Sequence, residues 1–178
     1  MRAHVLIRLD LDEFLHEAVE DGDIERVRYL LTRHPRPRIE SRNEWSRSAL
    51  DLASQENHVI IMQLLVNVGG AALSATALRC ATRCDSFEAI TYLVGSSKNP
   101  FSYVNLLDDD KKSVLLNTMP FGRRTEKTVR HLIDLGADAA LKDTQGRNIA
   151  HHACSQSHFS LTAFKALINS AEIGRAHV

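Results

Sequence analysis

Apolar residues recur along the chain in pairs of short stripes that are separated by polar stretches. The first stripe of each pair carries a four-residue motif that ends in a small residue: Ala18, Ala53, Ala81, Thr118 and Ala153. These residues lie 35, 28, 37 and 35 positions apart. A near-constant period of this length is typical of stacked repeats, in which each repeat buries its apolar face only against its neighbours.

The second stripe of each pair predicts an outer helix with one buried face, because its apolar residues follow i, i+3, i+4 spacing. These stripes are Val27/Leu30/Leu31, Ile61/Met62/Leu65/Val66, Phe87/Ile90/Leu93/Val94, Val129/Leu132/Ile133 and Phe164/Leu167/Ile168. The first stripes then form inner helices, each of which needs a side-chain oxygen to cap its free amides. We expect these caps from Asp12, Ser48, Thr76, Ser113 and Asn148.

The clearest copy of the repeat, residues 136–153, resembles the ankyrin repeat. Against Gly-Ala-Asp-x-Asn-x-x-Asp-x-x-Gly-x-Thr-Pro-Leu-His-x-Ala it keeps seven of eleven fixed positions: Gly136, Ala137, Asp138, Asp143, Gly146, His151 and Ala153. It departs at Ala140, Asn148, Ile149 and Ala150. The resemblance implies an all-α fold, an ankyrin-repeat solenoid of about five helix-turn-helix units with short β-turn fingers, a finger being the loop before an inner helix.

The same pattern sets the expected domain boundaries. We expect a lead-in at 1–11, an ankyrin-repeat domain at 12–171 with repeats near 12–45, 46–73, 74–110, 111–145 and 146–171, and a tail at 172–178. Residues 69–76 leave no room for a full finger, so we expect that finger to be missing or shortened. Residues 173–178 match a translated sequencing adapter, and we expect them to be adapter read-through from a chain that naturally continues.

Composition and charge narrow the classes of function. Lys and Arg number 22 and Asp and Glu number 22, so the chain lacks the basic excess typical of a nucleic-acid binder or a membrane-surface protein. Three cysteines form no disulfide framework, and no apolar run is long enough for a leader or a membrane span. We expect a cytoplasmic or nuclear protein that has no nucleic-acid partner and does not insert into a membrane.

Candidate chemistry is sparse. The densest group of potential metal ligands is His151, His152, Cys154 and His158. The resemblance assigns His151 to a hydrogen-bonding bracket between repeats, and no second Cys/His pair lies at zinc-finger spacing. Cys80 and Cys84 alone do not close a tetrahedral site. No nucleotide-binding or catalytic motif is present, so we expect no metal, no cofactor and no enzymatic activity.

The resemblance implies a concave recognition surface made of finger tips and the ends of inner helices. Carried over residue by residue, that surface comprises Glu44, Trp45, Arg47, Gln55, Glu56, Arg83, Cys84, Asp109, Asp110, Lys112, Phe121, Thr144, Gln145, Arg147, Ser155 and Gln156. Trp45 is the only tryptophan, and tryptophan is among the residues most enriched in interface hot spots. Packing of Trp45 on the finger stem is the open alternative.

These observations favour a non-catalytic module that binds a protein or peptide partner on the concave face and is monomeric as a fragment. Three alternatives stay open. In the first, the chain is the docking or regulatory part of a larger truncated enzyme, channel or adaptor. In the second, it is a small ankyrin-type inhibitor of a transcription factor. In the third, it is itself an enzyme or a metal-binding protein. Neutral charge and the arginine-rich stretch before the second repeat count against the inhibitor, which would need an acidic face.

Overall fold

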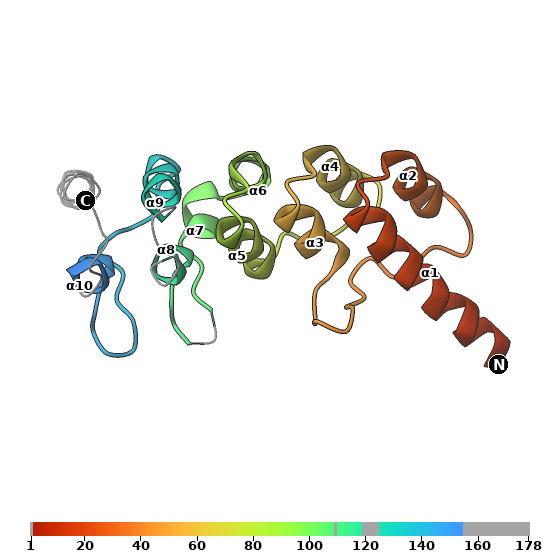
Figure 1. The fold of residues 1–178 in the computed structure, drawn as a ribbon, viewed down its shortest axis with the longest axis horizontal. Coiled ribbons are helices and arrows are strands. Elements are labelled where there is room, and N and C mark those ends of the chain that lie inside the picture. Colours follow the sequence, from red (N-terminus) through yellow and green to blue (C-terminus); the bar gives the residue numbers. More distant parts are fainter. Residues whose placement is uncertain (1, 109, 119–124, 155–178) are drawn as a thin grey trace. The chain divides into compact units, whose positions relative to one another are not determined.

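The computed structural model describes residues 2–108, 110–118 and 125–154 (Figure 1). These residues contain ten helices and, in place of strands, a single isolated bridge between Leu107 and Ser113. The predicted all-α repeat fold is confirmed. The chain divides into an N-terminal unit, Met1–Ile90, and a C-terminal unit, Thr91–Val178.

The N-terminal unit is built from helix-turn-helix pairs. Its inner helices are α1 (Arg2–Glu20), α3 (Ala49–Gln55) and α5 (Ala75–Arg83), and its outer helices include α2 (Ile24–Thr32) and α4 (Val59–Asn67). Helix α3 packs against both α1 and α5, and α2 packs against α4. Each pair therefore buries its apolar face against the next pair, as the repeat pattern predicts.

Small residues make this close approach of inner helices feasible. Ala18, Ala53 and Ala81 are all 0% exposed, at the positions where the four-residue motif ends. Larger side chains such as Leu15 and Met62 fill the space between inner and outer helices and are also fully buried. Burial of each large apolar side chain contributes about 1.5–3 kcal/mol, so the stack is held mainly by these contacts between pairs.

Local hydrogen bonds confirm several of the predicted helix starts. The Ser48 hydroxyl accepts from Asp51 N at 3.2 Å while the Asp51 carboxylate accepts from Ser48 N at 2.9 Å, which is a complete capping box. Ser113 Oγ accepts from Leu116 N at 3.3 Å, and Asn148 Oδ1 accepts from His151 N at 3.2 Å.

Two predicted caps are wrong. Asp12 lies inside α1, because nothing in residues 2–11 stops the helix before it, and its carboxylate instead accepts from Arg38 N at 2.6 Å and Arg38 Nε at 2.7 Å. Thr76 lies inside the first turn of α5, since Ser74 Oγ accepts from Ala77 N at 3.0 Å and starts the helix earlier.

The finger before α3 is a tight turn organised by one side chain. Asn43 Oδ1 accepts from Trp45 N at 3.1 Å and from Arg47 N at 3.0 Å, and Asn43 N donates to Arg47 O at 2.9 Å. Ser46 takes a left-handed φ of 58° to close the turn. Between α4 and α5, residues 70–74 make no turn, so the predicted shortening of that finger is seen.

Helix α6 (Phe87–Ser96) leads from one unit into the other, and the C-terminal unit continues with α8 (Val114–Asn117), α9 (Thr125–Asp134) and α10 (Ile149–Cys154). A further helix that the pattern did not predict, α7 (Pro100–Val104), precedes α8. It begins where Asn99 Oδ1 accepts from Ser102 N at 3.0 Å and Pro100 occupies the first turn.

The finger before α10 repeats the turn geometry with a carboxylate. Asp143 Oδ1 accepts from Gln145 N and Arg147 N, both at 2.9 Å, and Asp143 Oδ2 lies 2.9 Å from His152 Nε2. Gly136 has a φ of 94°, as expected of a glycine just past a helix. The expected last outer helix, with its apolar stripe Phe164/Leu167/Ile168, and the tail at 172–178 lie outside the described residues.

Candidate functional site

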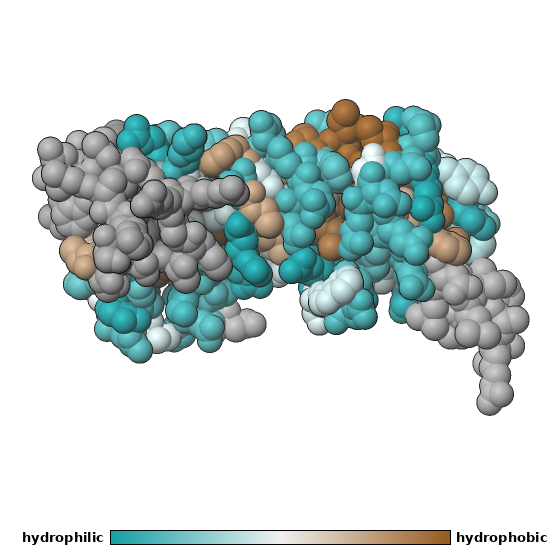
Figure 2. All heavy atoms as spheres, in the orientation of Figure 1, coloured by the Kyte–Doolittle hydropathy of each residue, from teal (hydrophilic) through white to brown (hydrophobic). Residues whose placement is uncertain are grey.

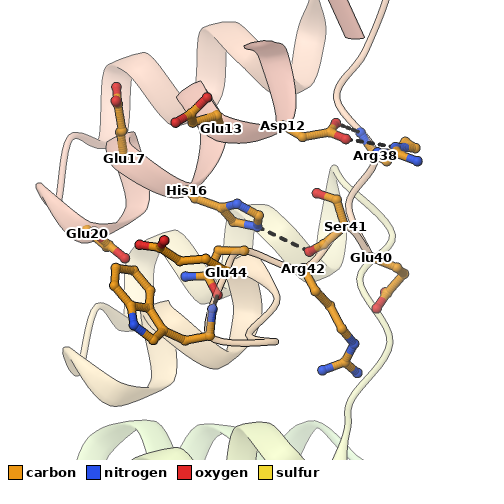
Figure 3. A pocket seen from close by; sticks show the side chains of 12 residues that line it. Asp12, Glu13, His16, Glu17, Glu20, Arg38, Glu40, Ser41, Arg42 and Glu44 are labelled. Atoms are coloured by element: carbon orange, nitrogen blue, oxygen red, sulfur yellow. Dashed lines mark hydrogen bonds and ion pairs between the residues drawn. The ribbon is translucent and has the colours of Figure 1, made fainter. Parts of the chain in front are cut away.

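A groove lies on the finger side of the N-terminal unit, between α1 and the segment 38–45 (Figure 3). Its volume is about 690 Å³. We call it the acidic groove, because six carboxylates and two guanidinium groups line it: Asp12, Glu13, Glu17, Glu20, Glu40 and Glu44 with Arg38 and Arg42. His16, Ser41, Asn43 and Trp45 complete its lining.

Two contacts fix the segment 38–45 to α1 and so fix the shape of the acidic groove. The buried Asp12 carboxylate binds the backbone and side chain of Arg38 through charge-assisted hydrogen bonds of 2.6 and 2.7 Å. His16, which is 7% exposed, places Nε2 3.2 Å from Ser41 O. Asp12 and His16 are one helical turn apart, so they hold two points of the segment against the same face of α1.

Trp45 stands at the edge of the acidic groove with its ring in solvent. The residue is 63% exposed, while its backbone N–H donates to Asn43 Oδ1. This exposure argues against packing of the ring on the finger stem. A large aromatic ring on a hydrogen-bonded turn loses little conformational freedom when a partner covers it.

The predicted site residues of the N-terminal unit form two neighbouring groups. Glu44 and Trp45 line the acidic groove. Arg47 Nη1 donates to Gln55 Oε1, and Gln55 Nε2 donates to Glu56 Oε1 at 2.8 Å, so these three side chains form one polar chain. Arg83 and Cys84 are exposed at the end of α5.

The predicted residues of the C-terminal unit lie on its fingers. Asp110, Thr144, Gln145 and Arg147 are exposed, and the partly exposed Lys112 donates its backbone N–H to Asp108 Oδ1 at 2.8 Å. Asp109, Phe121, Ser155 and Gln156 lie outside the described residues. Whether any of these residues contacts a partner stays a prediction.

The sequence pattern did not predict the side of the acidic groove that α1 forms. Asp12, Glu13, His16, Glu17 and Glu20 all come from α1. A usable signal existed, because acidic residues at positions 13, 17 and 20 follow i, i+4, i+7 spacing and fall on one face of a helix. The repeat pattern places residues 1–11 before the first repeat, whereas α1 begins at Arg2.

Neither Cys80 nor Cys84 is activated as a thiolate. Burial raises the pKa of Cys80, which is 7% exposed, and the nearby Asp51 carboxylate raises it further. Burial and the Glu56 carboxylate likewise raise the pKa of Cys84. Both thiols are therefore protonated at neutral pH, whereas reactive or metal-binding cysteines require the thiolate.

The histidines near the end of the described chain have partners of their own. His152 contacts Asp143, and His151 Nδ1 lies 2.5 Å from Asn148 Oδ1. The hydrogen-bonding bracket that the resemblance assigns to His151 stays a prediction, and His158 lies outside the described residues. Among the residues that the structure describes, no group of three or more His, Cys, Asp or Glu could hold a metal ion.

A second surface of the N-terminal unit is apolar. Ile60 is 55% exposed and Val68 41% exposed, both on or next to the outer helix α4. Figure 2 shows this brown surface over α4, away from the predominantly polar finger side.

None of the described helices is long and apolar enough to cross a membrane.

Comparison with known proteins identifies the family to which this fold belongs. A family profile described as "Ankyrin repeats (3 copies)" matches residues 15–108, which is more than half of the chain. The chain belongs to the ankyrin-repeat family. Arrays of this family generally mediate protein–protein interaction and are typically not enzymes.

The chain is also similar to a curated protein, the transient receptor potential cation channel subfamily A member 1 of Drosophila melanogaster. The two are 30% identical over 147 residues, which make up 77% of this chain and 12% of the Drosophila protein. The chain therefore spans only a small part of that relative.

Proposed function

We propose that the chain is a non-catalytic protein-binding module and that a protein or peptide partner docks in the acidic groove. The observation that carries the proposal is the exposed ring of Trp45, which stands on a hydrogen-bonded turn at the edge of a preformed groove. Hot spots of protein interfaces are enriched in tryptophan that fits against a pocket of the partner. Membership of the ankyrin-repeat family supports the same role.

The scaffold of the acidic groove also suits a binding role. Its two walls are joined by the Asp12–Arg38 and His16–Ser41 contacts, so the groove exists before a partner arrives. Preformed sites lose less conformational entropy on binding than sites that must be ordered.

We propose a cytoplasmic or nuclear location for the protein, supported by three cysteines that are all free thiols.

Affinity capture with matched variants tests this function. The purified chain, Trp45→Ala and Tyr29→Ala are immobilised, and proteins retained from an extract are quantified by mass spectrometry. Tyr29 is a matched control, because it is 60% exposed but lies on the outer helix α2. We expect proteins that Tyr29→Ala retains and Trp45→Ala loses about tenfold or more. Equal retention by all three proteins would contradict the proposed function.

A second candidate role is supported by the similarity to the Drosophila channel. Because the similar region is 12% of that relative, we infer that the chain serves as the docking or regulatory part of a larger protein. Sequencing the full natural transcript tests this role, and we expect it to encode a protein with further domains beside the ankyrin repeats. A natural transcript that encodes ankyrin repeats alone would contradict it.

A further inference from the structure

We infer that the acidic groove takes a lysine or arginine side chain from a basic peptide segment of the partner. This inference rests on the proposed function, since it specifies the chemistry of what docks in the same groove. Three features of the groove point to a cation: its uncompensated charge, its unpaired carboxylates and the exposed aromatic residue Trp45.

The charges around the acidic groove do not balance, although those of the whole chain do. Six carboxylates line it against two guanidinium groups, and both guanidinium groups already have acceptors within the chain. Arg38 binds the Asp12 carboxylate, and Arg42 Nη1 donates to Ser46 O at 2.6 Å. The groove therefore carries a negative field, which concentrates cations and repels acidic segments.

Three of the carboxylates have nothing to bind. Glu13, Glu20 and Glu44 are exposed and have no hydrogen-bond or ion-pair partner among the described residues. Glu17, by contrast, accepts from Arg26 Nη2 at 3.0 Å. Glu20 and Glu44 both line the groove, and Figure 3 draws them toward the same end of it.

Trp45 gives the cation an aromatic face. Trp45 is 63% exposed and is the residue next to Glu44. Tryptophan is the strongest aromatic partner for lysine or arginine, and the apolar stems of these side chains also pack on its ring. An acidic or apolar segment would instead cover Glu20 and Glu44 without pairing them, which is unfavourable.

Fluorescence of Trp45 tests the inference directly, because it is the only tryptophan of the chain. The whole chain is titrated at low salt with a peptide of alternating glycine and lysine, and with glycine–glutamate and glycine–leucine peptides of equal length. We expect the lysine peptide alone to change the emission in a saturable way, and added salt to weaken its binding. Saturable binding of the glutamate or leucine peptide would overturn the cationic assignment while leaving the proposed function standing.

Paired charge variants separate a specific site from general attraction. Glu20→Gln combined with Glu44→Gln should lower the affinity for the lysine peptide about tenfold or more. Glu25→Gln combined with Asp134→Asn removes the same charge from exposed positions on α2 and α9 and should change the affinity less than about twofold.

Three further outcomes are decisive. Equal loss in the two double variants would overturn the inference, since it would show attraction by net charge only. Calcium or magnesium ions that reproduce the emission change and displace the peptide would also overturn it, in favour of a metal site. If the lysine peptide binds as expected while affinity capture finds no protein that depends on Trp45, the proposed function fails and the cation site remains.

Discussion

The carboxylate of Asp51 joins three parts of the N-terminal unit, so its removal should weaken the stack. Asp51 is 0% exposed and accepts hydrogen bonds from Ser48 N at 2.9 Å and Ser74 Oγ at 3.2 Å. It also lies 3.7 Å from Arg42 Nη1. Ser48 begins α3, Ser74 begins α5 and Arg42 precedes the finger, so one side chain links two repeats and the wall of the acidic groove.

The cost of Asp51→Ala follows from these contacts. Leaving the buried Ser48 N–H without an acceptor costs about 1–3 kcal/mol, and losing the bond from Ser74 adds about 1 kcal/mol. The contact with Arg42 adds little, because the arginine side chain is 52% exposed. We expect the free energy of unfolding to fall by about 2–4 kcal/mol in Asp51→Ala. Asp51→Asn should lose about half as much, since its amide oxygen still accepts from Ser48 N.

Urea denaturation followed by circular dichroism measures both variants against the parent chain. The acidic groove gives a second readout, because Trp45 emission before unfolding should stay close to that of the parent. A loss below about 0.5 kcal/mol in Asp51→Ala would refute the reasoning, since that is the range of surface substitutions without structural consequence. An equal loss of unfolding free energy in Asp51→Ala and Asp51→Asn would show that the side-chain oxygen that accepts from Ser48 N does not provide the stabilisation.

Three other perturbations have expected outcomes. Ala81→Arg should lower the free energy of unfolding by about 3 kcal/mol or more in urea, because residue 81 is 0% exposed where α5 packs on α3; an unchanged midpoint would contradict the repeat register. Burial alone would raise the pKa of Asp143, but hydrogen bonds from Arg147 and His152 hold it well below its usual range. Its contribution to stability is therefore present above about pH 4 and lost at lower pH, and Asp143→Asn should flatten that dependence in urea titrations. A chelator should leave the melting temperature unchanged, and a fall of several degrees would indicate a structural metal.

Features that depend on nearby residues could be predicted from the sequence. Ser48 and Ser113 cap their helices because the groups they bind lie three residues away, and Gly136 ends a helix for equally local reasons. The small residues at Ala53 and Ala81 are buried where the period requires them. The repeat period reflects which face of each helix is buried. It was therefore sufficient to predict the all-α stack.

Features that depend on distant partners could not be predicted in the same way. The sequence predicts that Asp12 caps a helix. Its partner Arg38 lies 26 residues away, and no residue close to Asp12 in the sequence indicates that contact. The acidic groove exists only because that pair and the His16–Ser41 contact bring the segment 38–45 onto α1. Trp45 was predicted from its position on a finger tip, whereas the carboxylates opposite it required the folded arrangement.

Fluorine NMR of the chain labelled with fluorotryptophan is the most direct test of the claim that a partner docks at the acidic groove. The label enters at Trp45 alone, because the chain has a single tryptophan, and an unlabelled partner adds no signal. On addition of a purified partner obtained by affinity capture, we expect the one resonance to move or broaden in a saturable way, and Glu20→Gln with Glu44→Gln to require more partner for the same change. A partner that binds, as shown by an independent titration, while the Trp45 resonance stays where it was would contradict the account.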